Sequence, residues 1–203
     1  MTGGSREGLK NVARGLAFLA LLPFLASYRF KCVFIGVNRA LEGSSQVLSL
    51  VPGLPGRYMR QVFFSRVLAH CSRSVVIEFG TLFSQSGARL DDGVYIGPRC
   101  HLGLVHIGAD AMLGPCVQVP SGAHTHEHSS MDVSIQSQGL ARQLVHIGEG
   151  CWIGGNAVIM ADVGANTIIG AGAVVTRPIP PNVVAAGIPA RVIKERSTGD
   201  VTP

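Results

Sequence analysis

The chain has 203 residues and a mass of 21.3 kDa, which suits one domain with an appended segment. Charged residues make up 14%, 26 residues are glycine, and no Gly-X-Y period is present, so a disordered charged chain and a collagen are both excluded. The five cysteines form no CxxC pair. This excludes a zinc ribbon, argues against a disulfide framework and indicates a reducing compartment.

The positive charge is concentrated in the N-terminal third of the chain. Residues 1–73 contain ten Lys and Arg and two Glu, a balance of +8, whereas residues 74–203 contain seven basic and ten acidic residues, a balance of −3. A nucleic-acid binder would carry its basic residues on the folded domain, interleaved with aromatic ones. Here the basic residues flank an apolar stretch, so we expect an anionic lipid surface as partner and no nucleic acid.

The apolar stretch covers residues 15–28, 14 positions without a charge. A membrane-spanning helix needs about 20 such residues, and Pro23 is expected to kink or break a helix. A secretory signal peptide looks similar, but no A-x-A site follows Ala26. We expect residues 1–40 to associate with the cytoplasmic face of a membrane as an interfacial or re-entrant segment; a helix packed on the domain is the other alternative. We expect residues 41–75 to form amphipathic connector helices.

An internal repeat begins at residue 77. Aliphatic residues or Phe recur about every six positions, at Ile77, Phe83, Leu90, Ile96, Leu102, Ile107, Leu113, Val119, Ile147, Ile153, Ile159, Ile169 and Val175. In seven cases glycine follows directly, at Gly97, Gly103, Gly108, Gly114, Gly148, Gly154 and Gly170. The step of ten residues from Ile159 to Ile169 indicates one tightened turn.

A period of six predicts an all-β solenoid in which each hexapeptide forms a short strand and a turn. Three hexapeptides close one triangular coil, and stacked coils bury the aliphatic residues continuously. Glycine suits the next position, where a side chain would collide or a positive φ is needed. We expect about four coils in residues 76–178, with a loop inserted at 120–144. A C-terminal segment, 179–203, is expected to contain a short helix.

The segments IGPRCHLG, HIGEGCWIGGNAVIM, IIGAGAVVTRPIP and GIPARVIK resemble those of the hexapeptide-repeat acyltransferases. The segments LSLVPGLPGRYMRQVFF, EFGTLFS, VYIGPRC and VPSGAHTH are similar to the polysaccharide-biosynthesis branch, which includes colanic-acid-type O-acetyltransferases. The resemblance covers roughly residues 45–195. It implies a left-handed parallel β-helix, acetyl-CoA as co-substrate, and a homotrimer with sites between subunits.

The repeat stops at Val119 and restarts at Val145, and the intervening polar loop holds three of the seven histidines. A long excursion inside a compact domain is usually functional or disordered. A neutral imidazole is suited to take the proton of an acceptor hydroxyl. The resemblance, through the family's SGxxxH pattern, assigns this role to His126. His124 is the second candidate, because alternate positions share a face of an extended segment, and a loop without a catalytic histidine is the third possibility.

The resemblance also implies where the acetyl donor would bind. Trp152 would line a groove between subunits and pack on a sugar face or on the pantetheine arm, or else only cap a coil. Backbone groups of Gly155, Ala173 and Thr176 would contact pantetheine. Cations for the phosphates would come from Arg177, Arg191 and Lys194, for which a solvated surface is the alternative. No metal is expected.

The chain also resembles a different enzyme class of similar fold, the γ-class carbonic anhydrases, which hold zinc through three histidines, two of them in a His-x4-His pair. His101 and His106 have a matching x4 spacing, but both, like His146, directly precede an aliphatic-Gly pair and are expected to be surface residues. An acyl-enzyme on Cys100, Cys116 or Cys151 would require a thiolate beside a base, and these cysteines are expected to be small core or wall residues.

The sequence therefore predicts an acetyl-CoA-dependent O-acetyltransferase that acts by direct transfer on a sugar hydroxyl of a polysaccharide or a lipid-linked glycan precursor. A backbone N–H would hold the oxyanion. Within the same chemistry, N-acetylation of an amino sugar or acetylation of a small acceptor such as serine are alternatives. A non-catalytic β-helical scaffold is the alternative outside enzymes.

Overall fold

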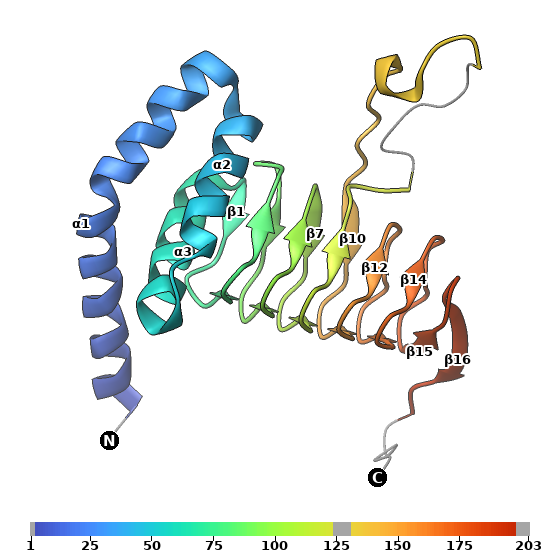
Figure 1. Ribbon diagram of the computed structural model, residues 1–203. Helices are drawn as coiled ribbons and strands as arrows, with labels where there is room; N and C mark the ends of the chain where they lie inside the picture. Colours follow the sequence, from blue (N-terminus) through green and yellow to red (C-terminus); the bar gives the residue numbers. More distant parts are fainter. Residues whose placement is uncertain (1–2, 124–130, 198–203) are drawn as a thin grey trace.

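The computed structural model describes residues 3–123 and 131–197. Three N-terminal helices are followed by a solenoid of stacked coils, and the helices lie at the solenoid's first end (Figure 1). The helices are α1 (Gly3–Ile35), α2 (Val37–Ser49) and α3 (Gly53–Val67). α3 and α2 lie against the first coil, and α1 forms the outer wall.

The solenoid consists of three sheets, one for each side of the triangular coil. The first, sheet A, contains β1 (His70–Cys71), β4 (Arg89–Leu90), β7 (Val105–Ile107) and β10 (Val145–Ile147). Sheet B contains β2 (Val76–Ile77), β5 (Tyr95–Ile96), β8 (Met112–Leu113), β11 (Trp152–Ile153), β13 (Ile168–Ile169), β15 (Val183–Ala186) and β16 (Arg191–Glu195). Sheet C contains β3 (Leu82–Phe83), β6 (His101–Leu102), β9 (Gln118–Val119), β12 (Val158–Ile159) and β14 (Val174–Val175). All pairings from β1 to β15 are parallel, as in a left-handed β-helix.

The aliphatic residues of the predicted repeat form the core of the solenoid. Each predicted aliphatic position is the inward residue of its strand, and in sheet B Ile77, Ile96, Leu113 and Ile153 stack in register with no exposed surface. The parallel strands begin at His70 and continue to Ala186, so the solenoid is longer at both ends than residues 76–178. The tightened turn is also confirmed: Val163 bridges Ile147 and Ile179 only four residues after Ile159.

Close backbone approach explains the glycine after each aliphatic residue. A Cβ on Gly154 would lie 2.4 Å from the amide nitrogen of Ala171, and one on Gly148 would lie 2.4 Å from that of Ala165. Neither glycine has a positive φ. Of the two reasons considered for glycine here, collision with the next coil is therefore the one that applies.

The C-terminal segment differs from the expectation of a short helix. Within the described residues after 179, the chain forms β15 and then β16, which pairs antiparallel with β15. A solenoid ends on unpaired backbone groups that attract further strands. The returning strand β16 satisfies this last edge, which a helix could not do through backbone pairing.

Of the two expected effects of Pro23, a kink or a break, the helix does not show a break. α1 continues through Pro23 to Ile35 and bends along its length (Figure 1). Pro23 is exposed, so the carbonyl that its ring prevents from pairing lies on the solvent side, where a long helix can curve. Within the described residues, Gly8–Ile35 is the one helical stretch long and apolar enough to cross a bilayer, on length and composition alone, and 11% of it is buried.

Candidate functional site at the stem of the inserted loop

The predicted loop leaves the solenoid at the edge between sheets C and A, after β9, and returns at β10 (Figure 1). A short 3₁₀ helix, η1 (Ile135–Ser137), lies on its returning arm. The loop histidines His124 and His126, and Glu127 beside them, lie outside the described residues.

The outgoing and returning arms of the loop are joined where they leave the solenoid, at Ser121 and Gln143, which we call the stem of the loop. Ser121 is almost fully buried, with a φ of 68°, and its hydroxyl accepts a hydrogen bond from the Leu104 amide at 2.8 Å. The Gln143 amide donates to the Ser121 carbonyl at 2.8 Å. Because both arms are fixed to the wall, the segment that carries the histidines is anchored on the solenoid at a defined point.

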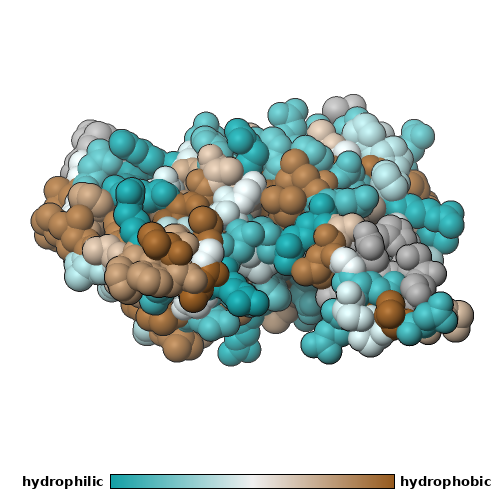
Figure 2. Space-filling view, turned by 90° about the horizontal axis from the view of Figure 1, so that it is seen from above, coloured by the Kyte–Doolittle hydropathy of each residue, from teal (hydrophilic) through white to brown (hydrophobic). Residues whose placement is uncertain are grey.

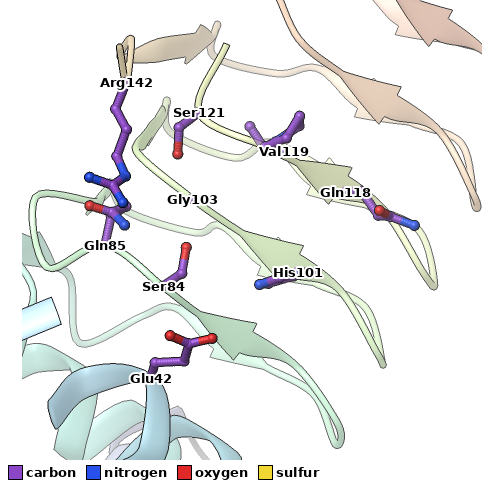
Figure 3. Close-up of a pocket in the computed structure, with 10 residues that line it drawn as sticks. Glu42, Ser84, Gln85, His101, Gly103, Gln118, Val119, Ser121 and Arg142 are labelled. Carbon is purple, nitrogen blue, oxygen red and sulfur yellow. The ribbon is translucent and has the colours of Figure 1, made fainter. Parts of the chain in front are cut away.

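A polar pocket of about 340 Å³ lies beside this stem (Figure 3). Its lining comes from α2, from three successive rungs of sheet C and from the returning arm of the loop: Glu42, Ser84, Gln85, His101, Gly103, Gln118, Val119, Pro120, Ser121 and Arg142. Figure 3 shows Arg142 and Glu42 at opposite ends of the hollow, with Ser84 between them. One cation, one carboxylate and several neutral donors and acceptors therefore surround the space.

Sequence reasoning missed most of this pocket. His101 was expected only as a surface residue; it is exposed, and its ring lies among the pocket groups. His101 and Gln118 occupy the same outward position on neighbouring rungs of sheet C. The sequence signal that could have indicated the pocket was the presence of polar residues at outward strand positions just before the inserted loop. Nothing local in the sequence could have added Glu42, which comes from a helix about sixty residues earlier.

The described histidines do not form a zinc site. His101 lies in sheet C and His106 in sheet A, so the x4 spacing does not bring them together. His106 Nε2 lies 2.9 Å from Asp91 Oδ2, and its ring packs on that of His146. Over residues 3–123 and 131–197, no group of three His, Cys, Asp or Glu side chains could hold a metal ion.

The residues predicted to bind the acetyl donor lie on the later coils but on different sides of them. Trp152 and Lys194 share one outward column of sheet B, through Ile168 and Val184. Gly155 and Ala173 lie in the turns between sheets B and C, whereas Thr176 and Arg177 follow β14, on the edge from which the loop departs. Arg191 is exposed on β16.

Ala173, one of the residues predicted to contact the donor, lies in a turn whose backbone groups are hydrogen-bonded. Its N–H donates to the Gly170 carbonyl at 3.2 Å, and its carbonyl accepts from the Val158 amide at 2.8 Å. Its side chain is buried. Both backbone groups are thus engaged within the coils, because this position closes the turn and pairs with the neighbouring rung.

An apolar column runs along the outside of sheet B. The outward residues in register are Val76, Tyr95, Met112, Trp152, Ile168 and Val184. Met112 is 50% exposed and Trp152 is 52% exposed. A continuous apolar stripe of this kind marks an interaction surface.

The buried cysteines Cys71, Cys100 and Cys151 are poorly suited to form an acyl-enzyme, whereas Cys116 is only partly buried. Burial raises the pKa of Cys100 to about 11 and that of Cys71 to about 12, and it also raises the pKa of Cys151. These thiols remain protonated at neutral pH, and the thiolate is the nucleophilic form. These three buried cysteines are therefore poor candidates for a cysteine intermediate.

Parallel sheets wound from six-residue repeats, with one inserted loop beside a polar pocket, define a hexapeptide-repeat solenoid protein. The family described as bacterial transferase hexapeptide (six repeats) matches residues 144–177. This part of the chain is therefore similar to the hexapeptide-repeat transferases.

Two curated relatives from Escherichia coli strain K12 are similar to parts of the chain. Galactoside O-acetyltransferase is 39% identical over 99 residues, which is 47% of this chain and 46% of that relative. WbbJ, named as an O-acetyl transferase of lipopolysaccharide biosynthesis, is 29% identical over 170 residues, 68% of this chain and 87% of that relative. The chain spans about half the length of the first curated relatives that it matches.

A solved structure shares the fold. It is a hexapeptide-repeat acetyltransferase from Vibrio cholerae O1 biovar eltor in complex with acetyl coenzyme A, with a TM-score of 0.57 and 20% identity. The alignment covers 81% of this chain and 90% of that chain.

Proposed function

We propose that the protein transfers an acetyl group from acetyl-CoA to a sugar hydroxyl of a polysaccharide or of a lipid-linked glycan precursor. The observation that carries the proposal is the anchoring of the histidine-bearing loop beside a polar pocket. The O-acetyltransferase names of the two Escherichia coli relatives support the same chemistry.

In this mechanism a loop histidine, His126 by the family pattern, accepts the proton of the acceptor hydroxyl. The hydroxyl oxygen attacks the thioester carbonyl, a backbone N–H stabilises the oxyanion, and the tetrahedral intermediate expels the coenzyme A thiolate, which takes up the proton. His124 is the second candidate for the base. No metal is required, because the thiolate is already a good leaving group.

The pocket chemistry suits a sugar acceptor. The side chains of His101 and Gln118 offer donors and acceptors on neighbouring rungs, and Ser84 adds a hydroxyl just after β3. Glu42 and Arg142 add charged partners. Sugar hydroxyls both donate and accept, so a lining of mixed polarity satisfies them better than an apolar one.

The donor site and the oligomer are linked in the proposal. The apolar column of sheet B would be buried against a second copy in a homotrimer, and Trp152 would then line a groove between subunits. Acetyl-CoA would lie along this groove beside Gly155 and Thr176, with Arg177, Arg191 and Lys194 near its phosphates. The outward placement and exposure of Trp152 and Met112 support this arrangement.

We further propose that α1 associates with the cytoplasmic face of a membrane. Its outer side exposes Leu9, Val12, Leu19, Phe30, Val33 and Phe34. In Figure 2 hydrophobic atoms gather at the left end of the molecule, where α1 turns into α2. Five Lys and Arg and no Asp or Glu occur between Gly8 and Leu41, so the charge around this apolar side suits anionic lipids.

The test is release of coenzyme A from acetyl-CoA with a panel of sugar, amino-sugar and serine acceptors, and mass spectrometry of the products. His126→Ala is expected to lower turnover at least about 100-fold, the usual contribution of a general base. His146→Ala, a histidine outside the loop, is the matched control and should retain activity.

The alternatives give different results. Loss of activity in His124→Ala but not in His126→Ala would move the base to His124. A product acetylated on nitrogen or on serine would show that the acceptor is an amino sugar or serine and not a sugar hydroxyl. The absence of any calorimetric signal with acetyl-CoA would favour a non-catalytic scaffold, and activity that disappears with a chelator would favour a zinc enzyme.

A further inference from the structure

Two adjoining hollows lie on the side of the helical end, between the N-terminal half of α1, α3 and the first coil. One, of about 420 Å³, has an almost wholly apolar lining: Ala13, Leu16, Ala17, Ala20, Leu54, Pro55, Tyr58 and Met59. The other, of about 470 Å³, is bounded in part by four cations: Lys10, Arg14, Arg57 and Arg73. Leu54 and Tyr58 line both hollows, so together they form one groove with an apolar arm and a basic arm.

Among the side chains that the structure describes, cations outnumber carboxylates around the basic arm. The described acidic groups are Asp92, which lines it and accepts hydrogen bonds from the Ser72 and Ser74 hydroxyls, and Glu78, which pairs with Arg57. Four cations and two carboxylates are therefore described there. Clustered Lys and Arg side chains favour a compact anion such as a phosphate group.

The groove is held open by fixed contacts. Arg14 donates from Nη2 to the Arg73 carbonyl at 3.1 Å, which ties α1 to the first coil. Further along, Ala17 and Leu21 of α1 are buried in the core of the helical end, and Phe24 packs edge-on against Phe63 of α3. The hollow is therefore part of the packed structure and does not depend on a movable segment.

We propose that this groove binds a phosphorylated lipid, with the hydrocarbon chain in the apolar arm and the phosphate among Lys10, Arg57 and Arg73. A free phosphate would leave the apolar arm unexplained, and a neutral lipid would leave the cations unexplained. The site lies on the helix whose exposed side we assign to the membrane surface, where such lipids occur. The inference concerns lipid binding and does not require that the protein transfer acetyl groups.

The experiment is calorimetric titration of the full-length protein with water-soluble phosphatidic acids of four, six and eight carbons per chain, with glycerol 3-phosphate as the headgroup alone. We expect affinity to rise with each added methylene by up to roughly fourfold, until the apolar arm is filled. Phosphatidylcholine of the same chain length should bind at least about tenfold more weakly, because its headgroup carries no net charge.

Two double variants distinguish binding in the groove from nonspecific electrostatic attraction to the positively charged helical end. Lys10→Gln with Arg73→Gln removes two cations from the groove and is expected to weaken binding of the eight-carbon phosphatidic acid at least about tenfold. Arg29→Gln with Arg39→Gln removes two cations from the same helical region outside the groove and should leave binding within about twofold. Equal weakening in both pairs would overturn the proposal.

The apolar arm has its own test. Ala20→Phe fills it and should abolish the dependence on chain length, whereas Ser27→Phe adds the same side chain elsewhere on α1 and should not. If wild-type affinity does not change with chain length, the proposal fails whether or not the variants fold. Farnesyl phosphate, titrated in parallel, identifies the source: tighter binding than phosphatidic acid indicates a polyprenyl phosphate, and weaker binding indicates a membrane phospholipid.

Discussion

The guanidinium of Arg60 donates from Nη1 to the carbonyl oxygen of Val51 at 2.7 Å, where the chain passes from α2 to α3. The same side chain reaches the Leu48 carbonyl at 3.1 Å and, through Nε, the Ile77 carbonyl of the first coil at 3.0 Å. Arg60 has no exposed surface, and its burial lowers the pKa of the guanidinium. One buried cation therefore joins both helices to the solenoid.

We predict that Arg60→Met lowers the free energy of unfolding by about 3 kcal/mol, because it leaves buried carbonyls unpaired. Arg57→Met, which removes a half-exposed ion pair with Glu78, should cost less than about 1 kcal/mol. Urea denaturation of both variants measures the difference. Equal losses would mean that the three carbonyl contacts of Arg60 contribute little.

Gly154→Ala is expected to destabilise the solenoid by about 2 kcal/mol or more, because the new Cβ would lie 2.4 Å from the Ala171 amide nitrogen. Gly43→Ala is the matched control. It lies within α2 with no atom within 4 Å of the added Cβ, so it should stabilise the protein by up to about 1 kcal/mol. Opposite shifts of the thermal midpoint check the close-packing explanation of the repeat glycines.

Met112→Glu should convert the proposed trimer to a monomer. It would place a carboxylate in the middle of the outward column of sheet B, between Tyr95 and Trp152, and an unpaired charge in a buried interface is costly. Light scattering after size-exclusion chromatography gives the mass. Arg89→Glu introduces the same side chain on sheet A and should leave the assembly intact; dissociation by both variants would argue against sheet B as the interface.

Alkaline pH should destabilise the fold through its buried thiols. The folded pKa of Cys71 is raised to about 12 and that of Cys100 to about 11, above the unfolded value of about 8.5. Their contribution is therefore complete below about pH 8.5 and is lost as pH rises toward the folded values. Urea denaturation from pH 7.5 to 10.5 should show this decline. Cys71→Ala should flatten it, and an unchanged slope would assign the decline to other groups.

Much of the fold could be predicted from the sequence because its rule is local. The six-residue spacing identifies the buried positions, from Ile77 to Val175, and the break after Val119 locates the inserted loop. Within the described residues the C-terminal segment forms strands instead of the expected helix, since the last coil offers Val183–Ala186 a partner strand that a local pattern does not reveal. The sequence left open whether Pro23 kinks or breaks the helix, because only the packed structure shows on which side of α1 it lies.

The sequence by itself determined the solenoid, since a repeated pattern of one buried side chain and one glycine closes the same coil each time, whatever follows it. The tertiary structure decided the pocket and the groove. Glu42, His101 and Arg142 meet only because α2 packs on the first coils and the loop returns beside them. Lys10 and Arg73 likewise face one hollow only because α1 folds back on α3. Residues that are distant along the chain become neighbours in this way because the free energy of packing, which is spread over many residues, decides how the elements come together.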